Sequence, residues 1–261
     1  MDSIPLIASS IMSKKLAAGA QCILLDVKTG SGAFMKTLEE ARELARVMTE
    51  IGNHAGRRTG ALITDMGRPL GYAVGNSLEV IEACETLRGR GPADLTEVCV
   101  RLAGGLLQLA GVCRENKEAC RCAKAQLENG RAFAKWKEMI TAQGGDAECA
   151  ERPELLPKAE ESCSLLAEQE GYVLSMDTEK CGEASVKLGA GRERKEDPID
   201  PAAGILLRKK PGEYVRKGDV LAELYFSKKV DPAAAQAALR EAYRIGGHMP
   251  PLPPLVYEAL F

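Results

Sequence analysis

A serine and a lysine four positions apart form the first candidate site of this chain. Ser10 and Lys14 lie in a stretch that is otherwise rich in isoleucine, leucine and alanine. In a helix, this spacing places both side chains on one face, one turn apart. A hydroxyl and an ammonium group arranged in this way could converge on one planar ligand that carries carbonyl groups. The alternative is a surface lysine whose stem covers apolar side chains while its charged end stays in water.

A glycine-rich loop follows at residues 26–35, which read Asp-Val-Lys-Thr-Gly-Ser-Gly-Ala-Phe-Met. Such loops often lie beside ligands when they follow a hydrophobic strand, because glycine lets the backbone approach closely. This loop lacks the Gly-Lys-Ser or Gly-Lys-Thr of a P-loop, and it does not match a dinucleotide fingerprint. We therefore interpret it as the wall of a small-molecule site.

The residues around the serine and lysine pair carry the start and stop signals of a helix. Ser3 is a candidate N-cap, and Pro5 falls in the first turn, where its missing N–H removes no helical hydrogen bond. Gly19 is a candidate stop because glycine readily adopts the left-handed conformation. We therefore expect a helix over residues 4–18 that positions the pair.

The next segments predict a β-α-β unit. Apolar runs over 21–27 and 59–64 indicate short buried strands, and apolar residues recur at helical spacing over 37–53 between them. We expect the two strands to be parallel. Further helices are predicted over 77–87, 93–110, 117–127 and 132–142.

A segment with two prolines at 151–158 marks a change of composition. We expect an incomplete α/β domain with a helical segment over 1–150 and a C-terminal α+β lobe over 151–261. Strands of the lobe are predicted over 164–167, 171–175, 204–209 and 220–226. Residues 249–254, Met-Pro-Pro-Leu-Pro-Pro, predict an extended tail. The predicted fold class is α/β, with a partial parallel or mixed sheet, flanking helices and this additional lobe.

Composition narrows the functional classes. With 45% hydrophobic residues in 261 positions, the chain can build a sizeable core, and a net charge of −2 argues against a nucleic-acid-binding surface. Its nine cysteines contain no Cys-x-x-Cys pair, which indicates reduced thiols rather than a disulfide framework or a zinc site. No stretch approaches the roughly 20 apolar residues of a membrane span, and the first residues do not resemble a signal peptide. We expect a cytoplasmic protein.

Six motifs in one order resemble those of pyrimidine-nucleoside phosphorylases. They lie at 3–19, 26–35, 65–76, 91–96, 188–192 and 212–219, the third reading Asp-Met-Gly-Arg-Pro-Leu-Gly-Tyr-Ala-Val-Gly-Asn. The resemblance covers nearly the whole chain. It implies that the chain corresponds to the C-terminal part of such an enzyme. The family's N-terminal helices, its Lys-x-Ser-Thr-Gly-Gly phosphate loop and its base-binding arginine are not found in this sequence.

The resemblance implies a phosphorolysis reaction. In the family, phosphate as co-substrate attacks the anomeric carbon of a pyrimidine nucleoside, and the free base and a pentose 1-phosphate result. Lys14 and Ser10 match the family's base-binding Ser-x-x-x-Lys. Lys14 would stabilise the negative charge that grows on the departing base, and Ser10 would orient the ring. No catalytic residue is assigned, and the choice among uridine, thymidine and deoxyuridine stays open.

The resemblance also implies a potassium ion. In the family, the positions of Leu70 and Ala73 contribute backbone carbonyl oxygens and the position of Glu82 contributes its side chain, a set of hard oxygen ligands. The residues themselves leave a simpler alternative, in which the loop is an ordinary turn and Glu82 is a solvated helix residue.

Two further parts of the sequence have weaker interpretations. Lys28 and Ser31 could approach the sugar, or they could only shape the turn into the next helix. Residues 171–173 and 215–221 resemble the hammerhead of biotinyl and lipoyl carrier domains. No modifiable lysine at a hairpin tip accompanies them, so we expect the lobe to be a scaffold that resembles a barrel-sandwich hammerhead.

Two functional classes therefore remain. The first is a pyrimidine-nucleoside phosphorylase whose partners are a pyrimidine nucleoside and phosphate, and which is inactive as this chain alone. The second is a non-catalytic, truncated binding or interaction module. The missing phosphate loop separates them, because without it the nucleophile is not held. The resemblance implies a homodimer for the full-length family. From the net charge and the lack of a long apolar stretch, we expect no nucleic acid or membrane partner.

Overall fold

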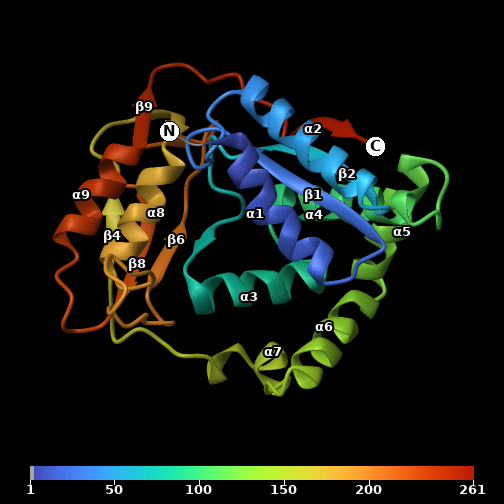
Figure 1. Ribbon diagram of the computed structural model, residues 1–261. Helices are drawn as coiled ribbons and strands as arrows, with labels where there is room; N and C mark the ends of the chain where they lie inside the picture. The colour runs from blue at the N-terminus through green and yellow to red at the C-terminus, as the bar shows by residue number, and fades with distance from the viewer. Residues whose placement is uncertain (1–2) are drawn as a thin grey trace. The chain divides into compact units, whose positions relative to one another are not determined.

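The computed structural model describes residues 3–261, which form two compact units (Figure 1). Unit 1 contains the chain up to Met66 together with Asp94–Asn129 and Pro253–Phe261. Unit 2 contains Gly67–Ala93 and Gly130–Leu252. Contacts group the residues on both sides of position 150 in unit 2, and the predicted domain boundary at that position stays a prediction.

Unit 1 is built on a three-stranded sheet with the order β1-β2-β10. Strands β1 (Cys22–Thr29) and β2 (Arg58–Asp65) are parallel and are joined through helix α2 (Leu38–His54). Strand β10 (Val256–Leu260) lies antiparallel on the other edge of β2. The predicted parallel β-α-β unit is confirmed, whereas β10 was not predicted.

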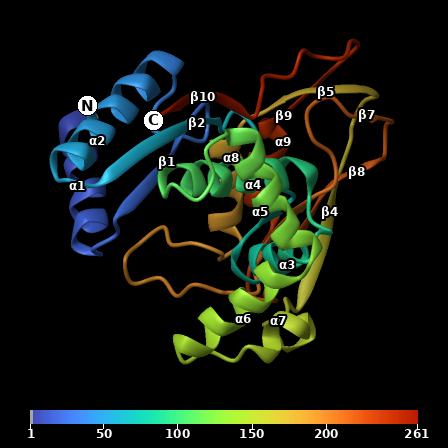
Figure 2. The same ribbon diagram turned by 90° about the vertical axis from the view of Figure 1, so that its right-hand side faces the viewer.

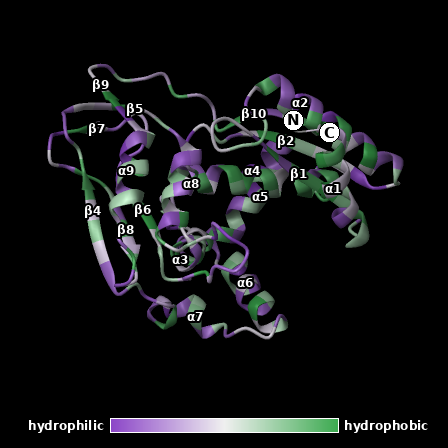
Figure 3. Ribbon diagram, turned by 60° about the vertical axis from the view of Figure 1, so that its left-hand side comes forward, coloured by the Kyte–Doolittle hydropathy of each residue, from purple (hydrophilic) through white to green (hydrophobic). Residues whose placement is uncertain are grey.

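Helices α1 (Ile4–Ala17) and α2 cover one face of this sheet (Figure 2). Side chains from both helices and from alternate positions of β1 form one buried cluster: Ala8, Met12, Ile23, Leu25, Val27, Ala41, Leu44, Ala45 and Met48 are all members. Hydrophilic and hydrophobic residues alternate along α2 (Figure 3), as an amphipathic helix requires. Burial of the apolar side chains of both helices in this cluster holds α1 and α2 on the same side of the sheet.

The local signals at the helix ends are partly realised. Thr37 and Glu40 form a reciprocal capping box at the start of α2. Ser3 occupies the N-cap position of α1 in an extended conformation, but its side chain makes no capping hydrogen bond. Gly19 ends α1 with a φ of +77°, a conformation that favours glycine.

The opposite face of β1 is approached by helix α4 (Ala93–Leu109), which is followed by α5 (Asn116–Glu128). Two adjacent glycines allow this close packing. A Cβ atom on Gly105 would lie 2.9 Å from a methyl carbon of Leu24, and one on Gly104 would lie 2.7 Å from the sulfur of Cys120. Larger residues at these positions would push α4 away from its neighbours.

Unit 2 contains two antiparallel sheets and several helices. The first sheet has the order β3-β6-β8-β4 and the second the order β7-β5-β9. Their strands are β3 (Ala73–Val74), β4 (Glu161–Leu166), β5 (Gly171–Met176), β6 (Gly204–Leu207), β7 (Tyr214–Val215), β8 (Val220–Phe226) and β9 (Tyr243–Gly246). The helices are α3 (Asn76–Leu87), α6 (Arg131–Ala142), α7 (Glu148–Glu151), α8 (Thr178–Lys187) and α9 (Ala233–Ala242), with a 3₁₀ turn η1 at Pro153–Leu155.

The sequence predicted most of these elements. The ends of the six predicted helices lie within one residue of those observed, and the predicted strand over 220–226 is observed unchanged. Helices α8 and α9 and strands β3, β7 and β9 were not predicted. Residues 249–254 contain no helix or strand, in keeping with the predicted tail, but the chain then continues into β10.

The α/β fold class is confirmed, as a mixed arrangement of small sheets and helices. The sheets assigned over residues 3–261 do not close into a barrel. In the same part of the chain, no helix has both the length and the apolar character needed to cross a lipid bilayer.

Candidate functional site

The predicted base-binding pair lies on the exposed face of α1. Ser10 and Lys14 are both exposed, and the hydroxyl of Ser13 donates to the backbone carbonyl of Ser10 at 3.1 Å. Ala8 and Met12, two positions earlier, are completely buried. A shift of two residues turns a helix by about 200°, so the pair faces away from the core of unit 1. This geometry permits both a ligand contact and an ordinary surface lysine, and the base-binding role of the pair stays a prediction.

A polar group that was not predicted joins the ends of β1 and β2. The ammonium of Lys28 lies 2.7 Å from a carboxylate oxygen of Asp26 and donates to the hydroxyl of Thr64 at 2.9 Å. That hydroxyl in turn donates to the other carboxylate oxygen of Asp26. Thr64 is fully buried, whereas about a quarter of each charged side chain is exposed (28% and 27%). The group therefore holds the Lys28 ammonium in a fixed, neutralised position.

The position of this group in the fold is typical of binding sites. Ligands of α/β proteins commonly bind at the carboxyl ends of parallel strands, and Lys28 is paired in register with Thr64 near those ends. Period-two alternation could have shown that Asp26 and Lys28 share a face of β1. Thr64 could not have been found in this way, because its place depends on the register between strands.

The glycine-rich loop after β1 is closed by backbone hydrogen bonds. Gly30 donates to the carbonyl of Met35 at 3.1 Å, and Gly32 donates to the carbonyl of Met66 at 3.0 Å. Lys36 adds a side-chain bond to the carbonyl of Ser31 at 2.8 Å. Phe34 stands at the surface with 77% of its area exposed. The loop is thus compact, and its role as a site wall stays a prediction.

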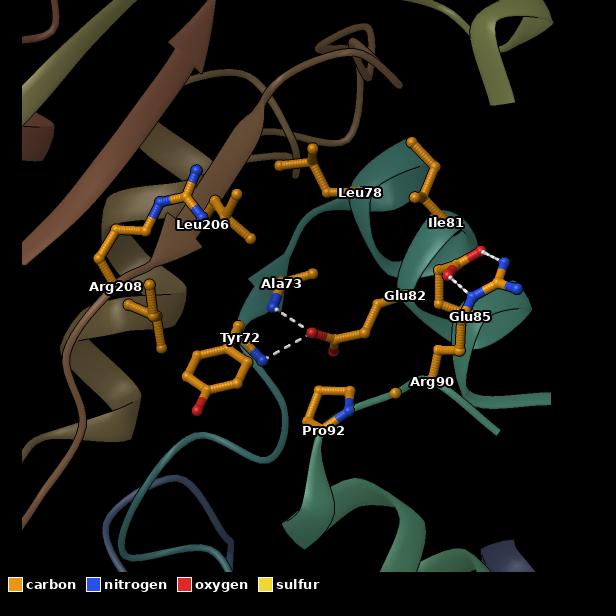
Figure 4. Close-up of a pocket in the computed structure, with 12 residues that line it drawn as sticks. Tyr72, Ala73, Leu78, Ile81, Glu82, Glu85, Arg90, Pro92, Leu206 and Arg208 are labelled. Atoms are coloured by element: carbon orange, nitrogen blue, oxygen red, sulfur yellow. Dashed lines mark hydrogen bonds and ion pairs between the residues drawn. The ribbon is translucent and has the colours of Figure 1, made fainter. Parts of the chain in front are cut away.

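In unit 2, Glu82 reaches from α3 to the loop that precedes β3. One carboxylate oxygen accepts the backbone N–H of Tyr72 at 2.8 Å and that of Ala73 at 3.2 Å (Figure 4). The other oxygen would lie 2.1 Å from a Cβ atom on Gly71, so any larger residue at this position would displace the carboxylate. Glu82 is therefore a half-buried residue that organises this loop, which excludes the alternative of a merely solvated helix residue.

The backbone of the loop leaves one carbonyl on the same side as Glu82. The carbonyl of Tyr72 accepts from Leu207 of β6 at 2.8 Å, and Ala73 is the next residue in the antiparallel register. The N–H and the carbonyl of one strand residue point to the same edge, and Ala73, unlike Tyr72, lies in β3. Since the N–H of Ala73 meets Glu82, its carbonyl points to that edge as well. These are hard oxygen donors, so the chemistry of Ala73 and Glu82 fits an alkali cation.

A buried lysine fixes the neighbouring carbonyl. The ammonium of Lys210 donates to the carbonyl of Gly71 at 2.8 Å and lies 5.2 Å from the ring centroid of Tyr72. Only 8% of Lys210 is exposed. The sequence around it, Arg-Lys-Lys-Pro, gave no sign that one of its cations is buried. The carbonyl of Gly71 is therefore committed to Lys210, whereas that of Ala73 points to the Glu82 side.

Glu82 opens onto a pocket of about 640 Å³ within unit 2 (Figure 4). Its walls are apolar at Leu78, Ile81, Leu206, Leu207 and Pro92 and charged at Glu82, Glu85, Arg90 and Arg208. Arg90 forms two hydrogen bonds with Glu85, at 2.7 and 2.8 Å, and these bonds keep the pKa of Glu85 below its usual value. Arg208 pairs with Glu223 at 2.7 Å. The pocket thus combines apolar walls with charges that are already paired.

Two family models match the chain. The α/β domain of a glycosyl transferase family matches residues 1–133, and the C-terminal domain of pyrimidine nucleoside phosphorylase matches residues 172–246. The first match includes Ser10, Lys14 and Glu82. The second includes Lys210, which holds the loop beneath Glu82.

Curated relatives agree with these matches. The chain is 45% identical over 260 residues to a pyrimidine-nucleoside phosphorylase of Geobacillus stearothermophilus, covering all of this chain and 60% of the relative. It is 48% identical over 237 residues to the enzyme of that name from Bacillus subtilis, covering 90% of this chain and 55% of the relative. It is 49% identical over 229 residues to a pyrimidine-nucleoside phosphorylase of Staphylococcus aureus, covering 88% of this chain and 53% of the relative. The chain therefore spans a little over half the length of these relatives, and it belongs to the pyrimidine-nucleoside phosphorylase family.

Proposed function

We propose that this chain carries the base-binding and cation-binding part of a pyrimidine-nucleoside phosphorylase. The complete enzyme transfers a pentosyl group from a pyrimidine nucleoside to phosphate, releasing the free base and a pentose 1-phosphate. The observation that carries the proposal is the 45% identity to a protein of that name along 260 residues. The Ser10 and Lys14 pair and the Glu82 loop both fall within that span.

Lys14 is suited to stabilise the departing base. Negative charge grows on the oxygens of the pyrimidine as the glycosidic bond breaks, so an ammonium donor beside them stabilises the transition state more than the substrate. Ser10, one turn earlier on the same exposed face, can orient the ring through hydrogen bonds. We assign both residues to substrate binding, and neither to proton transfer.

The proposal includes a potassium ion held by the carbonyls of Leu70 and Ala73 and by the carboxylate of Glu82. When bound, the ion would supply fixed positive charge near the phosphate co-substrate. The contribution of this chain's own residues is to hold the oxygens ready: Glu82 is fastened to two backbone N–H groups, and Lys210 fixes the carbonyl between Leu70 and Tyr72.

A thermal unfolding assay tests the cation site. A cation that binds only the folded state raises the unfolding temperature, so potassium chloride should stabilise the chain more than sodium chloride at equal concentration. Glu82→Gln should abolish this difference. Glu79→Gln is the matched control, because Glu79 also accepts a backbone N–H of this segment, from Gly75, but is not a proposed ligand. An equal potassium effect in both variants would contradict the site.

The phosphate site is the missing part. The sequence contains no Lys-x-Ser-Thr-Gly-Gly loop, and we propose that these 261 residues alone show negligible phosphorolysis. The test is a uridine and thymidine assay in potassium phosphate. It is run on the chain alone and on the chain co-expressed with the part of the Geobacillus stearothermophilus relative that precedes the match. Activity only in the combination supports the proposal. Turnover by the chain alone would contradict the proposal that these 261 residues are inactive without the added segment.

The second candidate is a non-catalytic binding module, and the observation in its favour is the coverage of only 53–60% of the relatives' length. Folded, soluble protein that stays inactive in both arms of the assay would support it. Family membership further suggests a homodimer and a cytoplasmic location for the complete enzyme, and we include both in the proposal. Sedimentation of the co-expressed complex tests the first of these.

A further inference from the structure

Two cysteine side chains of unit 1 approach each other away from the sites described above. Cys113 lies in the irregular link between α4 and α5, and Cys122 lies in α5. Their sulfur atoms are 3.9 Å apart. Figure 2 shows α4 and α5 next to each other, so the contact joins the end of one helix to the side of the next.

The two thiols differ in accessibility. Cys122 is exposed, whereas only 6% of Cys113 is exposed. Removal of water from Cys113 raises the pKa of its thiol, and the adjacent Cys122 raises it further. An accessible thiol beside a protected one is the arrangement in which the first meets an oxidant and the second reacts with the product.

Cys120 does not compete for the same contact. Residues two positions apart on a helix point to nearly opposite sides, and the sulfur of Cys120 lies instead 3.6 Å from the side-chain oxygen of Asn116. The same sulfur faces α4, close to Gly104. The contact with Cys113 is therefore specific to Cys122 among the two cysteines of α5.

The link can adjust to a shorter sulfur–sulfur distance. A disulfide requires about 2.05 Å, so the two sulfurs must move closer by about 1.9 Å. Cys113 lies outside both helices, and its N–H reaches the carbonyl of Leu107 only at 3.5 Å. A rotation of its side chain with a small backbone shift breaks no helical hydrogen bond.

We propose that Cys113 and Cys122 are a reactive thiol pair that hydrogen peroxide converts to an intramolecular disulfide. The Cys122 thiol releases its proton, and the thiolate attacks one peroxide oxygen. The O–O bond breaks, a sulfenic acid and hydroxide form, and the hydroxide takes up the released proton as water. The sulfur of Cys113 then attacks the sulfenic sulfur, the S–O bond breaks, and a second water leaves with the thiol proton. Two thiols and one peroxide thus give one disulfide and two waters. In a reducing cytoplasm such a bond is transient and serves as a redox sensor.

Trypsin separates the cysteines of this region, which makes the test direct. Cleavage after Arg101, Arg114, Lys117, Arg121 and Lys124 places Cys113, Cys120 and Cys122 on three different peptides. The full chain is treated with a small excess of hydrogen peroxide, free thiols are alkylated, and the unreduced digest is analysed by mass spectrometry. We expect residues 102–114 linked to residues 122–124, with the link lost after dithiothreitol.

Two variants make the result specific. Cys122→Ser changes an exposed residue and should abolish the linked peptide, whereas Cys120→Ser, two positions away in the same helix, should leave it unchanged. Circular dichroism of both variants verifies folding. A link between Cys122 and Cys120, a link between two copies of the chain, or peroxide-dependent sulfinic acid at Cys122 without any link would overturn the proposal.

Discussion

The ammonium group of Lys210 donates to the backbone carbonyl of Gly71 across 139 positions of sequence, at a distance of 2.8 Å and within the interior of unit 2. A buried charge is tolerated when it is hydrogen-bonded, and here its partner is the loop beneath Glu82. Lys210 therefore ties the C-terminal half of the chain to the loop that offers the candidate cation ligands.

Replacement of Lys210 by methionine should loosen this loop. Methionine keeps much of the stem but leaves the carbonyl of Gly71 without its charged donor, and we expect a loss of about 1–3 kcal/mol in the free energy of unfolding. Lys209→Met is the control, because Lys209 reaches a carbonyl only at 3.4 Å. Urea unfolding followed by the fluorescence of Trp136, the single tryptophan, reports on unit 2. Equal losses in both variants would refute this role.

Gly71→Ala should be more damaging than an alanine at an open glycine. Gly71 has a φ of +70°, which costs a non-glycine residue about 1–2 kcal/mol, and the new methyl group would displace the carboxylate of Glu82. Two backbone N–H groups would then lose their acceptor, for a further loss of about 1–3 kcal/mol.

The control for this prediction is Gly144→Ala. Gly144 has a similar φ of +79°, and nothing lies within 4 Å of its added Cβ, so it reports the backbone strain alone. The same fluorescence assay compares the two variants. The contact with Glu82 would be unimportant if the two free energies of unfolding fell equally.

Acid should weaken the pairing of Glu85. Its hydrogen bonds to Arg90, and then those to Arg88, keep the folded-state pKa below the reference value of 4.5. A carboxyl whose pKa is lowered by folding stabilises the protein above the unfolded-state pKa, and this stabilisation is lost as the pH falls through the folded-state value. We therefore expect Glu85→Gln to destabilise the protein above about pH 5 by about 1 kcal/mol or less, because 34% of the side chain is exposed.

The measurement for Glu85 is the free energy of unfolding as a function of pH, for the original chain and for Glu85→Gln. The two curves should differ at neutral pH and converge below pH 4.5, where the carboxyl becomes protonated. Curves that stay parallel through the acid range would show that the difference has another origin.

Lys14 should matter for turnover and not for stability. Its side chain is exposed, so Lys14→Met should change the free energy of unfolding by no more than about 0.5 kcal/mol. In the co-expressed complex, loss of a charged donor to the departing base should lower kcat by roughly 100-fold. Lys15→Met, at the next and equally exposed position, is the matched control. Similar activity in the two variants would identify Lys14 as a surface lysine.

The sequence predicted unit 1 well because its signals are local and strong. The parallel strands have continuous apolar runs, and α2 begins with a capping box and a clear amphipathic period. Strand β10 was not predicted, because it follows a proline-rich segment and its partner β2 is distant in sequence. Nothing in its own five residues indicates that pairing.

The candidate sites divide in the same way. The positions of Ser10, Lys14 and Glu82 followed from motifs that resemble a known family, and helical spacing was enough to place the first two on one face. Thr64 and Lys210 were not predicted, because their partners are set by strand register and by a contact across more than a hundred residues. In both cases a polar side chain is buried by long-range structure that no local pattern encodes.

Strand β1 has a consequence for handling this protein. It ends the order β1-β2-β10, so within residues 3–261 its outer backbone groups have no neighbouring strand apart from the bridge between Thr29 and Met35. Along this largely apolar strand, alternate residues then direct their backbone groups to an edge without a described partner strand, a template on which other chains can pair and aggregate. Solubility during expression should therefore depend on whether a further strand is supplied to cover that edge.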